Sequence, residues 1–303
     1  MIDLSVVIGT FNQAPVLEQV LRSFADQTHP SERFEVVVVD SASVDDTPAV
    51  CEPTRYPFPL RYVRKPNTGK ASARNVGLAT AAGPIVLLSD ADTIAEATLV
   101  AAHLDALDDF PGAVIVGQQF AVDGPVRSAD AERACLNPHW PRGRRLSWRQ
   151  FVTGNAALSR KALLDAGGFD EGFRGYGYED YELGYRLTKR GARFVFEPSA
   201  VSYHYHPGRY RQDLVRKREA GRSAVHFARR HPSWALRFHL GLTPVNRALY
   251  GRISAEGWLL RACSRLQGRD SATGRLARHL LLEVAYQHGA LEAWRERVEA
   301  GTD

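Results

Sequence analysis

The sequence predicts an α/β fold: a Rossmann-like, mostly parallel sheet flanked by helices, followed by a helical C-terminal extension. Runs of Val, Ile and Leu without polar alternation recur in the first two thirds of the chain, and such runs are typical of strands covered on both faces. Amphipathic helical patterns separate these runs, which favours right-handed parallel crossovers. Only helical patterns follow the last strand. We therefore expect a sheet domain over residues 1–206 and a helical one over residues 207–303.

The first half of the chain shows this alternation most clearly. Its first helical segment places Leu17, Val20, Leu21 and Phe24 on one face, as expected for a helix that packs on a sheet. The strands predicted in this half are residues 4–8, 34–39, 60–63 and 84–88, and the helices are residues 14–27, 70–82 and 95–107.

The second half continues the pattern around a long excursion. A loop-rich region runs from residue 121 to about residue 150, and long loops in compact domains are more often functional than idle. We expect this excursion and Gly154-Asn155 to shape the substrate pocket. Strands are predicted at residues 113–120, 151–158, 194–197 and 201–204, helices at 160–166 and 179–190, and later helix breaks near Pro232, Pro244 and Gly268.

The composition is that of a globular protein from a reducing compartment. The 303 residues are 44% hydrophobic and 24% charged, which argues against a disordered chain. The three cysteines are far apart, which argues against a disulfide framework and against a zinc site. The N-terminal residues lack the features of a signal peptide, and no run approaches the roughly 18 apolar residues of a membrane span. We therefore expect a cytoplasmic protein.

Positive charge is concentrated in one segment. Between Arg209 and Arg230 there are eight basic residues and two acidic ones, whereas the net charge of the chain is +5. One basic segment on a neutral body suggests an anionic ligand or an anionic membrane surface rather than nucleic acid, and a solvated helix face is an equal alternative. Only five of the 39 basic residues are lysines, a bias that suggests a bacterial gene of high GC content.

Polar residues gather where the predicted parallel strands end, which is where doubly wound sheets bind ligands. These residues are Thr10, Asn12, Asp40, Ser43, Asp90 and Asp92. Two carboxylates two residues apart suit a divalent cation, because Mg²⁺ and Mn²⁺ take hard oxygen ligands together with substrate phosphates. Aspartates in turns and helix caps are the alternative.

A second acidic segment opens the predicted helix at residues 179–190. It contains Glu179, Asp180 and Glu182. A carboxylate at this place can act as a general base, although adjacent carboxylates at a helix start also interact favourably with the helix dipole.

An ordered set of motifs resembles the inverting family 2 glycosyltransferases, which have the glycosyltransferase A fold. The resemblance covers roughly residues 1–206. Each motif is weak alone, but their order and spacing in one chain make chance agreement very improbable. The motifs span residues 5–12, 38–47, 67–75, 90–92 and 167–187.

This resemblance implies an enzyme that moves a sugar from a nucleotide-sugar donor, first of all a UDP-sugar, to a hydroxyl of a glycan, a glycolipid or another acceptor. It assigns Asp40 to the nucleotide base and places Thr10 beside the nucleoside, with Asn12 and Ser43 on the same two loops. From the residues alone, Asp40 could instead cap the following helix.

The resemblance also implies a site for Mn²⁺ or Mg²⁺. Asp92 is the firmer metal ligand in this family, Asp90 leans toward the ribose, and His204 matches a further cation ligand after the last strand. A buried, hydrogen-bonded histidine is the alternative for His204. Lys70 and Arg74 are about one helical turn apart and can face the nucleotide together, or they can form a surface pair.

For the chemical step, the resemblance favours Asp180 as the general base. It leaves Glu179 to position the acceptor or to support the structure, and the choice between the two carboxylates stays open. Arg209 and Arg211 follow the last strand closely, and we expect them to screen the departing phosphates.

Two other functions compete with this interpretation. A sugar nucleotidyltransferase also uses a parallel sheet and a cation, but residues 9–12 lack the glycine- and lysine-rich phosphate loop expected after its first strand. A non-catalytic nucleotide-sugar-binding or scaffolding subunit of a surface-polysaccharide assembly complex is the second rival. Candidates for both metal ligands and a base argue against it.

The helical extension suggests peripheral contact with the inner face of the plasma membrane. Residues 222–237 interleave arginines with Val225, Phe227, Trp234 and Leu236, and residues 258–260 add further apolar side chains. Basic amphipathic helices of this kind lie on anionic membranes. Packing against the sheet domain or a partner subunit is an equal alternative.

Overall fold

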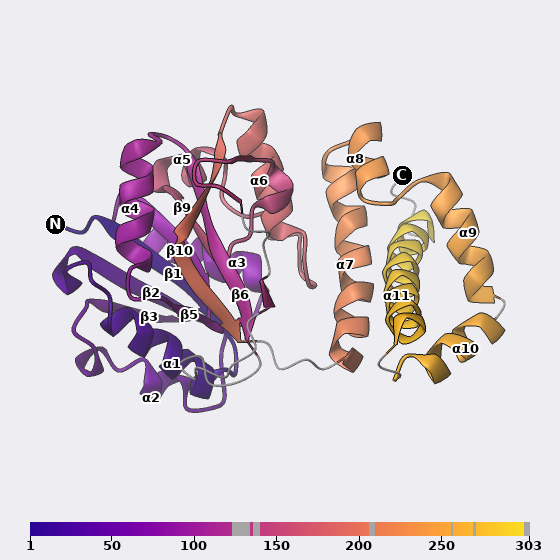
Figure 1. Ribbon diagram of the computed structural model, residues 1–303, viewed down its shortest axis with the longest axis horizontal. Coiled ribbons are helices and arrows are strands. Elements are labelled where there is room, and N and C mark those ends of the chain that lie inside the picture. The colour runs from indigo at the N-terminus through magenta and orange to yellow at the C-terminus, as the bar shows by residue number, and fades with distance from the viewer. Residues whose placement is uncertain (123–133, 136–139, 206–209, 256, 269–270, 300–303) are drawn as a thin grey trace. The chain divides into compact units, whose positions relative to one another are not determined.

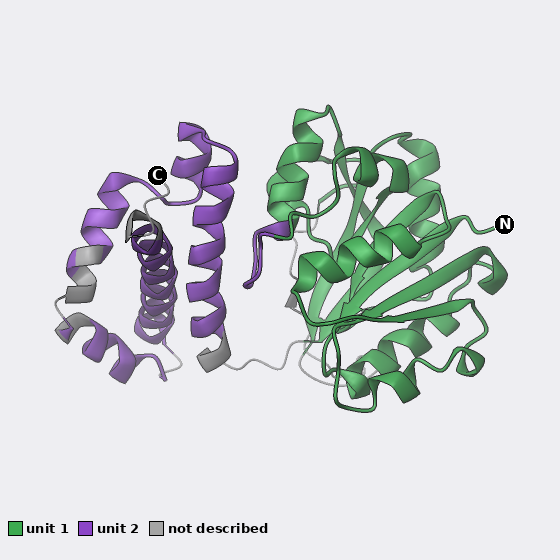
Figure 2. Cartoon of the chain, turned by 180° about the vertical axis from the view of Figure 1, so that it is seen from behind, with its two compact units in different colours: residues 1–171, 180–208 green, residues 172–179, 209–303 purple. Residues whose placement is uncertain are grey.

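The computed structural model describes residues 1–303 except 123–133, 136–139, 206–209, 256, 269–270 and 300–303. The chain divides into two compact units (Figure 2), and each is described here by itself. Unit 1 is residues 1–171 and 180–208, and unit 2 is residues 172–179 and 209–303. The short segment 172–179 therefore belongs with unit 2, although it lies within the sequence of unit 1.

Unit 1 is built on a ten-stranded sheet with the order β3-β2-β1-β4-β9-β6-β10-β5, in which β7 pairs with β6 and β8 with β10. Strand β1 is parallel to both neighbours, and β9 is antiparallel to both of its own. The predicted α/β fold with a mostly parallel sheet is confirmed. The strands are β1 (Leu4–Thr10), β2 (Phe34–Asp40), β3 (Leu60–Arg64), β4 (Ile85–Asp90), β5 (Thr93–Ala95), β6 (Val114–Val122), β7 (Ala134–Cys135), β8 (Arg145–Leu146), β9 (Asn155–Ser159) and β10 (Phe194–Tyr205).

Helices cover both faces of this sheet (Figure 1). Leu4, Val6 and Ile8 of β1 belong to an apolar cluster with α1 and α4, whereas Val7 belongs to a second cluster with α3, α5 and α6. Successive side chains of a strand point to opposite faces, so burial on both faces explains the continuous apolar runs. The helices are α1 (Ala14–Ala25), α2 (Thr47–Val50), α3 (Lys70–Thr80), α4 (Leu99–Asp109), α5 (Arg160–Asp165) and α6 (Glu179–Lys189).

Several elements differ from the sequence prediction. Strand β9 begins at Asn155 instead of residue 151, α4 begins at Leu99 instead of residue 95, and the short strands β7 and β8 lie in the predicted loop region. Residues 194–205 form one strand instead of two, because the pairing of β10 with β6 continues through a register shift between Glu197 and Val201; such a bulge bends a strand without ending it. Residues 93–95 form the strand β5, where the sequence predicts no strand before the next helix. This strand is antiparallel to β10 and places Thr93 opposite His204.

A buried polar network joins the middle of the sheet. The side-chain amide of Asn155 donates to the carbonyl oxygens of Gln118 and Ala200 and to the Ser202 hydroxyl. The other amide atom, Oδ1, lies 2.7 Å from Nε2 of His103 on α4. Since Oδ1 can only accept, His103 Nε2 carries the proton in this contact.

Lowering the pH should destabilise the protein through His103. Burial lowers the pKa of this fully buried imidazole from 6.5 to about 4. Between these two values the unfolded chain binds a proton that the folded chain does not, so the free energy of unfolding falls with the pH, by about 3 kcal/mol over the whole window. The variant His103→Gln retains an N–H donor but cannot titrate. Urea unfolding from pH 7 to pH 4 should therefore show a weaker pH dependence in this variant, and equal slopes would contradict the assignment.

Unit 2 is helical. Helices α7 and α11 cross with their backbones in close contact, since a Cβ on Gly221 would lie 1.9 Å from the carbonyl oxygen of Tyr286 and a Cβ on Gly289 would lie 1.8 Å from that of Arg218. Only glycine fits at such a crossing. The helices are α7 (Tyr210–Arg230), α8 (Trp234–His239), α9 (Pro244–Ala255), α10 (Trp258–Leu266) and α11 (Ala272–Glu299), with breaks at the predicted positions.

The proposed membrane-facing side chains of this unit are mostly in its core. Val225, Phe227 and Leu236 are no more than 2% exposed, so the expectation that they insert into a bilayer is wrong. Their burial between helices explains the same apolar spacing. Trp234 is 70% exposed, and the side chains of Trp258 and Leu259 lie outside the described part of the structure. No helix in the described residues is long and apolar enough to cross a membrane.

Candidate active site

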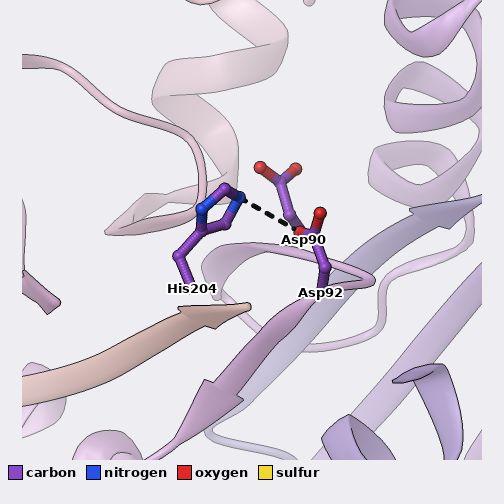
Figure 3. Close-up of side chains that lie close together, drawn as sticks. All are labelled: Asp90, Asp92 and His204. Atoms are coloured by element: carbon purple, nitrogen blue, oxygen red, sulfur yellow. Dashed lines mark ion pairs between the residues drawn. The ribbon is translucent and has the colours of Figure 1, made fainter. Parts of the chain in front are cut away.

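Asp90, Asp92 and His204 come together at one edge of the sheet (Figure 3). Asp90 ends β4, and Asp92 follows in the turn before β5. The pairing of β5 with β10 continues into this turn, where the backbone N–H of Tyr205 donates to the carbonyl oxygen of Asp92 over 2.8 Å. This ladder brings His204 beside Asp92. One ligand atom from each of the three side chains lies within 4.8 Å of the others.

Two cations from α3 hold Asp90. Lys70 Nζ lies 3.1 Å and Arg74 Nη2 lies 2.9 Å from the same carboxylate oxygen. Burial alone would raise the pKa of Asp90, but the charges of Lys70 and Arg74 lower it below its usual value. Asp90 is therefore ionised, and much of its charge is already balanced by protein side chains.

Arg74 lies inside the protein rather than on its surface. Its side chain is 2% exposed, and its guanidinium carbon lies 5.2 Å from the centre of the Phe169 ring. A buried guanidinium needs a partner for its charge, and Asp90 supplies one. The surface-pair alternative thus fails for Arg74, whereas Lys70 is 45% exposed. Contact of either residue with a nucleotide stays a prediction.

Asp92 pairs with the imidazole of His204 in the same cluster. Nε2 of His204 lies 3.3 Å from Oδ1 of Asp92. Burial by itself would lower the pKa of His204, but the hydrogen bond to Asp92 and the charges of both aspartates raise it. A cation that uses this nitrogen must displace the proton, so its binding weakens as the pH falls.

The donor atoms of this cluster fit Mn²⁺ or Mg²⁺. Both ions prefer carboxylate oxygens as ligands, and Mn²⁺ can also bind an imidazole nitrogen. Adjacent ligands about 2.1 Å from an octahedral ion are about 3 Å apart, close to the 3.3 Å between His204 and Asp92. Asp92 and His204 would hold the ion, with Asp90 at its side.

The loops after β1 and β2 brace each other. The backbone N–H of Asn12 donates to the Ser43 hydroxyl, and the Asn12 side chain accepts from the backbone of Val44, both over 2.8 Å. Asn12 has φ 51°, a left-handed conformation that asparagine tolerates. Thr10 is buried, and its hydroxyl has no hydrogen-bond partner among the described residues. These residues share the sheet edge of Asp90, because Gly9 pairs with Asp90 and Thr10 with Asp40.

Asp40 is fully buried at the end of β2. Its carboxylate accepts from the backbone N–H of Ser43 over 2.9 Å and from the Tyr62 hydroxyl over 2.6 Å. Burial and this hydrogen bond raise the pKa of Tyr62. Asp40 therefore stabilises the strand-end turn, and a contact with a nucleotide base stays a prediction. The sequence does not distinguish Tyr62 from its neighbours, because it lies inside an ordinary strand pattern.

The acidic residues of α6 have different surroundings. The side chain of Glu182 is fully buried and forms an ion pair with Arg186. The Arg186 guanidinium also donates to the carbonyl oxygens of Ala166 and Gly168. This network fixes α6 to the preceding turn. Glu179 is 6% exposed, whereas Asp180 is partly exposed and accepts from the backbone N–H of Tyr181 over 2.8 Å.

Additional residues line the Asp90 side of the site. A Cβ on Gly154 would lie 2.8 Å from Nε2 of Gln119 and 3.3 Å from Oδ2 of Asp90, so the backbone of Gly154 passes directly by the carboxylate. Nε2 of Gln119 and the hydroxyl of Thr93 are buried without a hydrogen-bond partner in the described residues. In the sequence, Gln119 differs from its surroundings only in being a polar residue within an apolar strand.

The two predicted phosphate-screening arginines cannot be placed. Arg209 lies outside the described residues, and Arg211 is in α7 with a side chain that the structure does not describe.

Comparison with known proteins identifies the family. The model of glycosyl transferase family 2 matches residues 5–166, more than half of the chain. The chain belongs to glycosyl transferase family 2. A second family model, described as the N-terminal domain of galactosyltransferase, matches residues 137–208 of this family 2 member. The two matches together include both aspartates of the cluster, α6 and His204.

Curated relatives agree with this assignment. This chain is 29% identical to validoxylamine A glucosyltransferase of Streptomyces hygroscopicus subsp. jinggangensis. The alignment covers 93% of this chain and 71% of that protein. The chain spans 65 to 71% of the length of the first curated relatives that it matches.

Two solved structures share the fold. Residues 1–349 of S. aureus TarS in complex with UDP superpose with a TM-score of 0.61 and 17% identity, covering 97% of this chain and 92% of that one. The mannosyltransferase PcManGT from Pyrobaculum calidifontis, in complex with GDP-Man and Mn²⁺, gives a TM-score of 0.62 and 23% identity over 95% and 85% of the two chains.

Proposed function

We propose that this protein is a metal-dependent, inverting glycosyltransferase that moves a hexose from a nucleotide sugar to a hydroxyl group of an acceptor. The observation that carries this proposal is the Asp90, Asp92 and His204 cluster at the ligand-binding edge of a parallel sheet. The solved structures with UDP and with GDP-Man and Mn²⁺ support a nucleotide-sugar donor. A UDP-sugar is the first donor to test.

In the donor site, the loops after β1 and β2 hold the nucleoside. Thr10 and Asp40 end these two strands, and Asn12 and Ser43 lie in the loops, which are cross-braced by hydrogen bonds. Such preorganisation reduces the entropy lost on binding. Lys70 extends from α3 toward the same edge and pairs with Asp90, where it can also face a donor phosphate.

At the metal centre, Asp92 and His204 would hold the cation and Asp90 would complete the cluster. When bound, Mn²⁺ or Mg²⁺ supplies positive charge that stabilises the leaving diphosphate. Arg74 and Lys70 keep Asp90 ionised and fixed in place. Gly154 leaves room beside this carboxylate that any larger residue would fill.

Asp180 acts as the general base. It takes the proton of the acceptor hydroxyl while that oxygen forms a bond to the anomeric carbon, on the face opposite the diphosphate. The bond between the anomeric carbon and the diphosphate oxygen breaks, its electrons leave with the nucleoside diphosphate, and the anomeric configuration inverts. The partial exposure of Asp180 supports this choice over the buried Glu179.

The acceptor is a glycan, a glycolipid or a small glycosylated product. Relatives named chondroitin synthase and validoxylamine A glucosyltransferase support both polymeric and small acceptors. For peripheral membrane contact, the exposed Trp234 and Phe238 of α8 are the side chains that remain available.

Donor turnover tests the proposal. The purified protein should consume one of a panel of UDP-, GDP- and dTDP-sugars in the presence of Mn²⁺ or Mg²⁺. Removing the metal with EDTA should lower this rate by about 100-fold or more, because the cation stabilises the charge that develops in the transition state by several kcal/mol. Added Mn²⁺ should restore the rate. Turnover that is insensitive to EDTA would refute metal dependence, and consumption of no donor would refute the function.

A further inference from the structure

Unit 2 contains a cavity of about 740 Å³ that the sugar-transfer mechanism above does not use. Segment 172–175, α7 and α11 form its walls. Four arginines against two glutamates give these walls a formal excess of two positive charges. The charged lining residues are Arg174, Arg222, Arg229, Arg230, Glu219 and Glu296.

Neighbouring side chains hold two of the α7 arginines at this cavity, Arg222 and Arg229, in place. Nη2 of Arg222 lies 2.5 Å from a carboxylate oxygen of Glu296 on α11, and the guanidinium carbon of Arg229 lies 5.2 Å from the centre of the Trp294 ring. Arg174 and Arg230 are exposed at the cavity, and Arg174 has no acidic partner among the described residues. Fixed arginines bind phosphate and carboxylate groups well because little side-chain freedom remains to be lost.

The shape of this site favours a discrete ligand over a lipid surface. A hollow of several hundred Å³ accommodates a small molecule or a single residue of a polymer, whereas a helix that lies on a bilayer buries an apolar face beside its basic one. The other walls include an aromatic contact and a hydroxyl group. The Phe173 ring meets the His226 ring edge to face, with centroids 4.6 Å apart, and the Ser223 hydroxyl donates to the carbonyl oxygen of Tyr176.

The same wall continues along segment 172–179, which directly precedes the proposed base in the sequence. Gly175 and Gly177 lie against α7, where a Cβ on either would be 3.6 Å from that helix. The backbone N–H of Tyr176 donates to Glu219, and the Tyr178 and Tyr286 hydroxyls are 3.2 Å apart. Asp180 is six residues beyond Arg174, so at most about 20 Å of extended chain separates them.

We propose that this cavity binds an anionic group of the acceptor, either a phosphate or a carboxylate. An acceptor held there contacts segment 172–179, whose next residue in the chain is Asp180. The acceptor part of this inference rests on the proposed function, whereas binding of an anion to unit 2 does not.

Titration calorimetry on the full-length protein tests the anion site directly. In EDTA and without nucleotide, the wild type should bind inorganic phosphate or glucuronate, and the stronger of the two identifies the anionic group. The double variant Arg174→Gln, Arg230→Gln should bind about tenfold more weakly, because hydrogen bonds to charged groups are lost. Arg252→Gln removes one positive charge from an exposed position on α9 of the same unit and should leave the affinity unchanged. No binding by the wild type, or equal binding by the double variant, overturns the proposal.

Kinetics then separate this site from the donor site. In the double variant, hydrolysis of the nucleotide sugar in the absence of acceptor should equal that of the wild type, while the KM for an anionic oligosaccharide acceptor should rise about tenfold with kcat retained. If the wild type turns over no donor, the proposed function fails, but calorimetry still decides whether the cavity binds anions. Flotation with vesicles of phosphatidylcholine and phosphatidylglycerol that depends on Arg174 and Arg230, without binding of either soluble anion, would assign these arginines to a membrane and overturn the cavity site.

Discussion

Replacing Asp180 with asparagine should lower kcat for sugar transfer by about 10³-fold, within the range that a general base contributes. The amide has nearly the same shape as the carboxylate and can still accept the N–H of Tyr181, but it cannot take a proton from the acceptor hydroxyl. Binding of the donor does not require this proton transfer. We therefore expect the KM for the nucleotide sugar to change by less than about twofold, measured by steady-state kinetics at saturating acceptor.

Glu179→Gln is the matched control for this experiment. It makes the same change of carboxylate to amide one residue earlier, at a side chain that is 6% exposed. Its effect on kcat should be much smaller, and thermal unfolding of both variants will show whether the fold is retained. A larger loss of kcat in Glu179→Gln than in Asp180→Asn, with both proteins folded, would assign the base to Glu179.

Replacing Asp92 with asparagine should weaken metal binding and lower the rate of sugar transfer by about 10³-fold. Lys70 and Arg74 already balance the charge of Asp90, so Asp92 is the carboxylate whose charge is available to a cation. The neutral amide also lowers the pKa of His204, because the partner that raises it is lost. Mn²⁺ affinity, measured by electron paramagnetic resonance without nucleotide, should fall by about 100-fold or more.

Asp109→Asn removes the same charge far from this cluster. Asp109 is an exposed partner of Arg142 at the end of α4, and its loss should change neither Mn²⁺ affinity nor rate, since exposed ion pairs contribute little. If Asp92→Asn binds Mn²⁺ as tightly as the wild type, the metal site lies elsewhere. Retained metal binding with lost activity would restrict Asp92 to a role in the chemical step.

The order of strands and helices in unit 1 was predictable because burial on two faces leaves a local pattern. Each of the strands β1 to β4 is an apolar run, and the structure extends each run by only one or two residues. The position of Asp90 and Asp92 after such a run was predictable for the same reason. The short strand β5 was not, because three residues carry too little periodicity to be distinguished from the start of α4.

Contacts within the site were harder to predict. Arg74 has the sequence context of an amphipathic helix, and only packing against Phe169 and Asp90 shows that it is buried. The sequence places Asp40 at a strand end whether it binds a nucleotide base or caps the next helix. The hydroxyl that donates to its carboxylate comes from Tyr62 on another strand, which the sequence does not show. For the same reason, Val225 and Phe227 suit both a membrane and a helical core, and their burial decides for the core.

By itself, the sequence determined the fold class, the family resemblance and the acidic residues at the strand ends, because hydrophobic period and short motifs are local properties of the chain. Only the tertiary structure placed His204 beside Asp92, since that contact depends on the antiparallel pairing of β5 with β10. It alone grouped residues 172–179 with the C-terminal helices. Pairings between residues so distant in the chain arise from the packing of whole elements, which no short stretch of sequence encodes.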